Sequence, residues 1–289
     1  MAVQAKVIRK RIKSVSSTKK ITRTMEMVAG SKLRLAKERV QSSGPYLDQL
    51  RSLMRELGAS GIDVARWPHF EVREGKRTLI LVMTSNRGLC GAFNANLIRL
   101  GKQTYDDMVA EGRDVTLHVA GRKGISAYRY QGYKAAATYI DELSDKPTPE
   151  HADFFLRELT DPFLRGEVDE VCVVYPHWIS VGRQPPTVLK LLPIAPEESE
   201  TSSSMPPLFE PSAEAILDQL LPLYLRQTIY SVLAEAVASE QLARRMAMKL
   251  ATDNAEEMVT NLTRDYNKAR QAQITKELSE IIGGSEALK

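Results

Sequence analysis

Apolar residues recur at alternating spacings of four and three along the last third of the chain. The spaced positions are Ala251, Ala255, Met258, Leu262, Ala269 and Ala272. This spacing is typical of a coiled-coil seam. Neither Gly nor Pro occurs between Gln227 and Ile282, and good helix formers predominate there. We therefore expect one long helix that begins after an N-cap at Ser212 and ends at Gly283-Gly284.

The first forty residues have the same periodicity, which predicts a second long helix. Its seam begins with Ile8, Ile12 and Val15, turns polar at Lys19, Thr22 and Glu26, and becomes apolar again at Ala29, Leu33, Ala36 and Val40. A second stripe, formed by Ile21, Met25, Val28 and Leu35, lies around the helix from the first. We expect Ser43-Gly44-Pro45 to kink or interrupt this helix before it resumes towards Leu57.

The middle of the chain changes from helical to strand periodicity. Residues 78–83 (TLILVM) read as a buried strand, and further strands are predicted over 115–120, 137–140, 170–175 and 186–192. Helices are predicted between them, over 92–111, 123–130 and 150–164. Strands that alternate with helices favour a small α/β domain with a largely parallel sheet. We place this domain at 73–196.

This order predicts two helical arms that flank an inserted domain: an arm over 1–58, a polar linker over 197–211, and a second arm over 212–289. A compact domain brings its entry and exit close together, so the arms should run antiparallel, with position i facing about 270 − i. The second arm is longer than the first. Its end carries an apolar stripe that needs a cover from another protein, and the stripe consists of Ile274, Leu278, Ile281 and Ile282.

The charge is unevenly distributed. The first forty residues carry twelve Lys or Arg and two Glu, although the whole chain has a net charge of only +4. A basic helix suggests either a nucleic-acid partner, a membrane surface, a solvated face or an acidic partner within the same protein. No run of 18 apolar residues and no signal-peptide core occurs, which predicts a soluble, non-secreted protein whose membrane link is indirect.

Catalytic chemistry has little support in the sequence. The four His residues are scattered, and the two cysteines, Cys90 and Cys172, form no CxxC pair, so we expect no metal site and reduced, buried thiols. The loop over 84–91 follows a strand and precedes a helix, where a phosphate can bind, yet it matches neither GxGxxG nor GxxxxGK[ST]. A tight turn is the simpler interpretation. A nucleotide-dependent enzyme remains one alternative, and a coiled-coil nucleic-acid tether remains another.

Several motifs resemble one family. The segments KKITRTMEMVAGSKLRLA, TSNRGLCGAFN, ASEQLARRMAMKLATDNAEEM and YNKARQAQITKELSEIIGG are similar to the gamma-subunit family of the rotary, proton-translocating ATP synthase. The resemblance covers both arms and the loop. It implies a fold of the class α/β plus coiled coil, in which long N- and C-terminal helices form an antiparallel coiled coil around an inserted, Rossmann-like domain.

The resemblance also implies a function and a set of partners. Such a chain is the central rotor shaft within three alpha and three beta subunits, and its α/β domain sits with the epsilon subunit on the membrane ring of c subunits. It couples proton-driven rotation to conformational cycling of the catalytic beta subunits. It has no catalytic residue, cofactor or metal of its own. A bacterial chain at the cytoplasmic face of the plasma membrane is implied, and an organellar inner or thylakoid membrane is left open.

The resemblance assigns roles to particular positions. Those that contact beta subunits are Met25, Gln271, Thr275, Glu277 and Glu280. The stripe Ile274, Leu278, Ile281 and Ile282 would occupy an apolar bearing sleeve, and Phe209 and Glu210 would touch the membrane ring. Two positions depart from the family pattern, since Asn86 replaces an acidic residue and Ala92 replaces a glycine. These departures argue against an ion or phosphate role for the loop.

Overall fold

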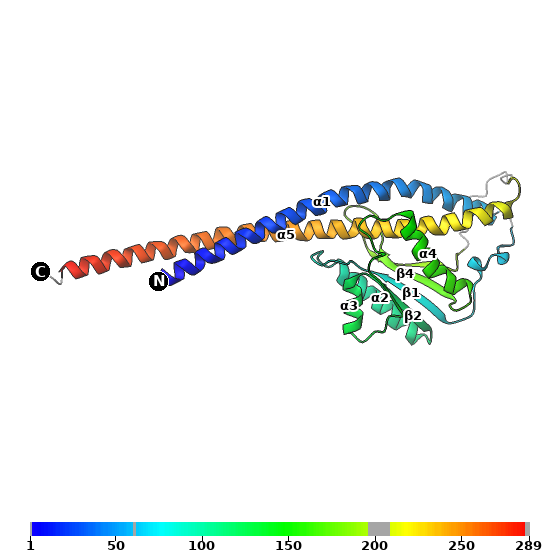
Figure 1. Cartoon of the computed structure of the whole chain (residues 1–289), viewed down its shortest axis with the longest axis horizontal. Coiled ribbons are helices and arrows are strands. Elements are labelled where there is room, and N and C mark those ends of the chain that lie inside the picture. The colour runs from blue at the N-terminus through cyan, green and yellow to red at the C-terminus, as the bar shows by residue number, and fades with distance from the viewer. Residues whose placement is uncertain (1, 60–61, 196–208, 287–289) are drawn as a thin grey trace. The chain divides into compact units, whose positions relative to one another are not determined.

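The computed structural model describes residues 2–59, 62–195 and 209–286. Two long helices, α1 (Ala2–Ala59) and α5 (Ala213–Glu286), are the first and last elements of the chain (Figure 1). The chain forms two compact units. The helix unit contains Met1–Gly30 and Arg244–Lys289, and the sheet unit contains Ser31–Ala243. Most of the predicted linker 197–211 lies outside the described residues.

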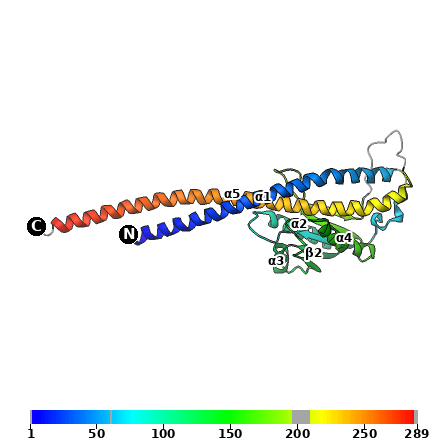
Figure 2. The same cartoon turned by 45° about the horizontal axis from the view of Figure 1, so that its top comes forward.

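In the helix unit, α1 and α5 form the predicted antiparallel coiled coil (Figure 2). Ile8, Ile12 and Val15 of α1 are half-buried, and Thr22 and Ala29 are buried. The pairing is defined by two contacts. The Thr22 and Thr252 hydroxyl oxygens lie 2.8 Å apart, and Lys19 Nζ lies 2.9 Å from Glu256 Oε1. Position i therefore faces about 274 − i, so the predicted register was wrong by about one helical turn.

The seam of α5 differs from the predicted one at alternate positions. Ala255 is buried and Leu262 is half-buried, but Met258 is 51% exposed and Ala251 is only half-buried. Thr252, one residue beyond Ala251, is 2% exposed. The seam thus passes through Thr252, Val259 and Tyr266 rather than Ala251 and Met258. The Thr22–Thr252 contact explains this difference. A buried threonine is tolerated in the seam when its hydroxyl has a hydrogen-bond partner, whereas a search for apolar residues alone passes over it.

The sheet unit contains the predicted α/β domain. Its five strands have the order β3-β2-β1-β4-β5, and all neighbours are parallel except β4 and β5. The strands are β1 (Arg77–Met83), β2 (Asp114–Ala120), β3 (Ala137–Tyr139), β4 (Glu170–Pro176) and β5 (Pro186–Leu192). The helices between them are α2 (Phe93–Ala110), α3 (Arg122–Tyr130) and α4 (Pro149–Leu164). The predicted sequence of strands and helices is confirmed.

Both faces of the sheet are covered, and every residue of β1 from Thr78 to Met83 is buried. One face packs Ile80 and Val82 against Leu97 of α2 and Tyr128 of α3. The other face packs against α4 and against the parts of α1 and α5 that belong to this unit, through side chains such as Leu57, Phe155, Phe163 and Leu233. The long helices are therefore part of the hydrophobic core of the sheet unit.

Two predicted helix boundaries differ in the structure. The helix α1 continues through Pro45, so of the kink or interruption expected there the interruption does not occur. Proline removes one helical hydrogen bond, but buried Leu47 and Leu50 on the next turns favour continuation. The helix α5 continues past Gly283-Gly284 to Glu286. Its predicted start is confirmed, because the Ser212 hydroxyl accepts the Ala215 N–H at 3.2 Å.

Gln241 is a buried polar residue whose replacement should stabilise the chain. It is 1% exposed, and its Nε2 has no acceptor among the described residues. Because an unpaired buried amide is costly and leucine has a similar volume, Gln241→Leu should raise the free energy of unfolding by about 1–2 kcal/mol. Urea unfolding followed by tryptophan fluorescence measures this. Gln49→Leu, at an exposed position of α1, is the control and should change little.

Candidate interaction surfaces

The helix unit exposes apolar side chains outside its seam. Ile21 and Val28 of the predicted second stripe are exposed, and Met25 between them is half-buried. On α5, Met246 and Leu250 are also exposed. Exposed apolar side chains gathered on one element are typical of a surface that another protein covers. The stripe therefore lies on the outside of α1, where another protein can contact it.

The last turns of α5 extend beyond the pairing with α1. With the observed register, α1 begins opposite about residue 272. The four apolar residues of the predicted tip are all exposed: Ile274, Leu278, Ile281 and Ile282. Gln271, Thr275, Glu277 and Glu280 are exposed as well. We refer to residues 271–282 as the distal segment, which thus presents both apolar and polar side chains outward.

Local contacts in the distal segment are weak. Gln273 Nε2 donates to Glu277 Oε1 at 2.9 Å, and Lys276 Nζ lies 3.4 Å from Glu280 Oε1. Both carboxylates are well exposed, and an exposed pair of this kind stabilises a helix by roughly 0.3–0.5 kcal/mol. The polar side chains are therefore free to change partners when another surface approaches.

The basic start of α1 is exposed. Arg9, Lys10, Arg11 and Lys13 are all exposed, and one internal acidic partner of α1 is Glu256, which pairs with Lys19. That pairing lowers the pKa of the Glu256 carboxyl through the hydrogen bond from Lys19. The predicted pairing of the basic helix with acidic residues of the second arm therefore occurs at Lys19. The four cations nearer the N-terminus face outward.

Phe209 and Glu210 lie immediately before α5. Phe209 is half-buried and packs against the core of the sheet unit, whereas Glu210 is exposed. The core of the sheet unit thus fixes the position of the Phe209 side chain without a partner subunit. Glu210 is thus the side chain of the pair that extends into solvent.

The loop over 84–91 is closed by hydrogen bonds within the protein. The first three N–H groups of α3 are all satisfied by this loop: Arg122 N–H donates to Asn86 Oδ1, Lys123 N–H to the Ser85 carbonyl, and Gly124 N–H to the Thr84 hydroxyl. Helix N-termini bind phosphate through such N–H groups. The N-terminus of α3 is therefore occupied by this loop. At α2, the helix that follows the loop, the Phe93 N–H donates to the Cys90 carbonyl and Asn94 Oδ1 accepts the Ser85 N–H, contacts typical of a tight turn.

Asn86 has a structural role that explains its departure from the family pattern. Its Nδ2 donates to the Ile140 carbonyl at 2.9 Å and to the Leu143 carbonyl at 3.2 Å, while its Oδ1 accepts the Arg122 N–H at 3.1 Å. A carboxylate can only accept hydrogen bonds, so it cannot replace both donations. The amide of Asn86 thus joins the loops that follow β1 and β3.

Asn86→Asp should destabilise the sheet unit. Two carbonyl oxygens would lose their donor and would face a negative charge, so the free energy of unfolding should fall by about 1–3 kcal/mol at neutral pH. The loss should shrink as the pH falls and the new carboxyl becomes protonated and able to donate. Urea unfolding at two pH values measures both effects. Asn96→Asp is the control, because the Asn96 side chain accepts a hydrogen bond from Arg99 and donates none to another described residue.

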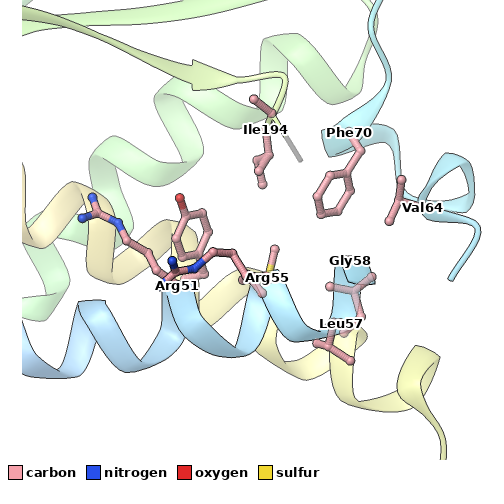
Figure 3. A pocket seen from close by; sticks show the side chains of 11 residues that line it. Arg51, Arg55, Leu57, Gly58, Val64, Phe70 and Ile194 are labelled. Carbon is pink, nitrogen blue, oxygen red and sulfur yellow. The ribbon is translucent and has the colours of Figure 1, made fainter. Parts of the chain in front are cut away.

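The cavities do not resemble a nucleotide site. An apolar cavity of about 40 Å³ lies between the end of α1, the start of α5 and the short helical turns Val64–Arg66 and Pro68–Phe70 (Figure 3). Phe70 and Ile194 line one side, and Arg51 and Arg55 extend from α1. Its volume is far below the roughly 300 Å³ of small ligand pockets.

A larger cavity of about 290 Å³ lies at the amino edge of the sheet. It is lined by paired charges, since Glu170 binds both Arg113 at 3.3 Å and Lys190 at 3.2 Å. Ligands of open α/β sheets bind at the opposite, carboxyl edge. This cavity therefore lies away from the position where such folds bind nucleotides.

The side chains that could bind a metal ion are dispersed, and the two cysteines are buried. No group of three His, Cys, Asp or Glu that suits a metal ion occurs within 2–59, 62–195 and 209–286. Cys90 and Cys172 are free and buried, and burial raises the pKa of the Cys172 thiol. Among the helices described, none is long and apolar enough to cross a membrane.

Comparisons with known proteins agree over the length of the chain. The family model described as ATP synthase matches residues 4–288. The ATP synthase gamma chain of Gemmatimonas aurantiaca is 42% identical over 289 residues, and the match covers 99% of each chain. The gamma chain of Leptospira biflexa is 39% identical over 284 residues, with 97% of this chain and 98% of the relative covered.

Solved structures show the same fold. A chain in the structure of the Euglena gracilis mitochondrial ATP synthase, which includes OSCP, F1 and the c-ring, aligns with a TM-score of 0.71 at 18% identity. The alignment covers 100% of this chain and 95% of that one. Fold, full-length relatives and the family model lead to the same result: the chain belongs to the family of ATP synthase gamma chains.

Proposed function

We propose that this chain is the central rotor shaft of a proton-translocating ATP synthase. Its rotation would couple proton flow through the membrane ring to ATP synthesis in the beta subunits, or ATP hydrolysis to rotation in reverse. The observation that carries this proposal is the distal segment, where α5 continues beyond α1 and exposes Ile274, Leu278, Ile281 and Ile282. A helix with an uncovered apolar end needs a surrounding partner.

The partners follow from the family. Three alpha and three beta subunits would surround the paired helices, and the epsilon subunit and the ring of c subunits would bind near the α/β domain. Glu210, exposed beside the anchored Phe209, is our candidate for contact with the ring. The chain itself supplies no catalytic residue, because ATP chemistry belongs to the beta subunits. The family of gamma chains also accounts for the basic first helix, so a nucleic-acid tether is not needed to explain it.

Rotation would act through unequal contacts. A shaft changes a conformational equilibrium only when it contacts the two states differently. In the helix unit, the α1 stripe is apolar at Ile21 and Val28, whereas the distal segment adds exposed Gln271, Thr275, Glu277 and Glu280. We propose that these four residues and Met25 meet beta-subunit loops in succession, so that each beta subunit meets a different surface as the shaft turns.

The site of action would be the cytoplasmic face of a bacterial plasma membrane. The relatives at 42% and 39% identity are bacterial gamma chains. Contact with the membrane would be indirect and would pass through the c-ring. The chain would therefore be a peripheral subunit of the complex.

Co-expression tests the proposal. The chain should co-purify with alpha, beta and epsilon subunits as a complex that hydrolyses ATP, and the complex should drive proton pumping when the membrane ring is present. A chain that purifies alone from cells expressing all the subunits, or that binds nucleic acid with a steep salt dependence, would contradict it.

The exposed cations at the start of α1 should support assembly or coupling. Arg9, Lys10, Arg11 and Lys13 face outward, so replacing all four with Gln removes an attraction for acidic loops of the surrounding subunits. We expect a drop in ATP-driven proton pumping of about fivefold or more at physiological salt, the range of a typical coupling energy. Pumping equal to that of the unmodified complex would refute this role. Neutralising exposed Arg129 and Lys134 of the α/β domain is the control.

A further inference from the structure

The loop between β4 and β5 connects the α/β domain to both long helices within the sheet unit. It folds back on itself, with Ser180 N–H donating to the Arg183 carbonyl and Arg183 N–H to the Ser180 carbonyl, both at 3.1 Å. Before this turn, the Trp178 side chain packs against a small cluster formed by Ala36 and Val40 of α1 and by Val237 and Ala238 of α5. The indole thus packs against a cluster to which both helices contribute. We refer to residues 177–185 as the β4–β5 loop.

Glu235 of α5 binds this loop from within the protein. Its Oε2 accepts the backbone N–H of Trp178 at 2.8 Å and lies 2.9 Å from His177 Nδ1. Its Oε1 accepts a hydrogen bond from the Ser231 hydroxyl at 3.1 Å. The residue is 9% exposed. Both oxygens of a buried carboxylate are therefore engaged, and one of them holds the backbone of the loop.

We propose that Glu235, by holding the backbone of Trp178, is the positioning residue through which the α/β domain transmits torque to the two-helix shaft. This inference rests on the proposed rotor function. The residue acts on no substrate. Its role would be to keep the α/β domain and the helices from sliding past each other under load.

The physical basis is the difference between apolar and directional contacts. Apolar burial resists separation of two surfaces, but it is non-directional and depends little on small sideways shifts. A hydrogen bond weakens steeply when its angle changes, and a bond to an ionised acceptor is shorter and stronger than a neutral one. Because torque acts sideways on the helix surface, the Glu235 carboxylate adds a directional restraint to the packed apolar core.

Other polar links between the α/β domain and the long helices are more exposed. Arg226 of α5 lies 2.5 Å from Asp153 of α4, but their side chains are 48% and 34% exposed. Lys32 of α1 pairs with Asp145, and both side chains are more than a third exposed. Water competes with exposed pairs of this kind. Among these links, Glu235 alone combines a buried carboxylate with a backbone donor.

The test uses the whole ATP synthase in membrane vesicles. Glu235→Ala should leave ATP hydrolysis under no load near that of the unmodified complex. ATP-driven proton pumping and ATP synthesis should each fall by about threefold or more relative to hydrolysis, the scale of a positional coupling effect. Glu235→Gln keeps an acceptor for the Trp178 N–H, so it should retain most of the coupling.

The matched control is Asp153→Asn, which weakens the exposed pair with Arg226 and should leave the ratio of pumping to hydrolysis unchanged. An equal loss of hydrolysis and pumping in Glu235→Ala, or an unchanged ratio, would overturn the inference. If Glu235→Ala does not enter the complex, Glu235→Leu decides, because leucine fills a similar volume but offers no acceptor for the Trp178 backbone N–H. A lowered ratio of pumping to hydrolysis in Glu235→Leu supports the inference, and an unchanged ratio overturns it.

A failure of the proposed function would look different. In that case the unmodified chain would not enter the complex, and no ratio could be measured. An unmodified complex that pumps protons, together with a Glu235→Ala complex of equal coupling, would refute the torque role alone.

Discussion

Gly121→Ala should be the most destabilising single substitution in the α/β domain that we consider. Gly121 precedes α3 with φ +96° and ψ +134°, a backbone conformation that residues with a side chain rarely adopt. A Cβ atom there would also overlap the Thr84 carbonyl oxygen. Strain of roughly 1–3 kcal/mol and overpacking of roughly 1–3 kcal/mol add, so the free energy of unfolding should fall by about 3 kcal/mol or more.

The measurement is urea unfolding followed by tryptophan fluorescence, because both tryptophans, Trp67 and Trp178, lie in the sheet unit. Gly132→Ala is the matched control. Gly132 also has a positive φ, of +85°, but no atom lies within 4 Å of an added Cβ. It should cost only about 1–2 kcal/mol, the strain alone. Equal losses for the two variants would show that the close packing of Gly121 on Thr84 is unimportant.

Replacing the apolar residues of the distal segment should have the largest effect on coupling. Ile274, Leu278, Ile281 and Ile282 are each 44% to 68% exposed in the chain. Burial of one such side chain by a partner stabilises a complex by about 1.5–3 kcal/mol. Changing all four to Ser should therefore reduce torque and ATP-driven pumping about tenfold or more, since each 1.4 kcal/mol corresponds to a factor of ten.

The same change should spare the catalytic sites. Nucleotide binding to beta subunits should persist, because we expect the nucleotide sites to be formed by the surrounding subunits and not by this segment. Val72→Ser and Val109→Ser, at exposed apolar positions of the sheet unit, are the controls and should leave pumping unchanged. Normal torque in the four-Ser complex would show that the distal segment is not held by its apolar side chains.

The sheet and its helices could be predicted from the sequence because their signals are local. A continuous apolar run such as 78–83 has few alternatives to a buried strand, and the predicted strand 186–192 coincides with β5. The length of the C-terminal helix could be predicted because neither Gly nor Pro occurs between Gln227 and Ile282. The continuation through Pro45 did not, because buried side chains on neighbouring turns outweigh one missing hydrogen bond.

The details of the coiled coil and of the interaction surfaces depend on pairs that are distant in the sequence. The seam passes through Thr252 because Thr22 lies opposite, and neither threonine signals this alone. Asn86 departs from the family pattern, and its reason became visible only with the carbonyls of Ile140 and Leu143 in place. Glu235 is one of many acidic residues on a long helix. Only the fold brings it to the Trp178 N–H.

The beta-contact, bearing and ring-contact residues remain predictions. The structure places Met25 half-buried and Gln271, Thr275, Glu277 and Glu280 on exposed turns. Such placement is compatible with contact. Each role depends on a surface that belongs to another subunit, and cross-linking within the assembled complex is the direct way to test it.

The most direct test of the rotor function is to watch the chain turn. Tyr130 is 94% exposed and the two native cysteines are buried, so Tyr130→Cys gives one accessible thiol for a bead. With the alpha and beta subunits fixed to a surface and ATP added, the bead should rotate in one direction with three equal pauses per turn, one for each beta subunit. ATP hydrolysis by the complex with a bead that stays still would contradict the account.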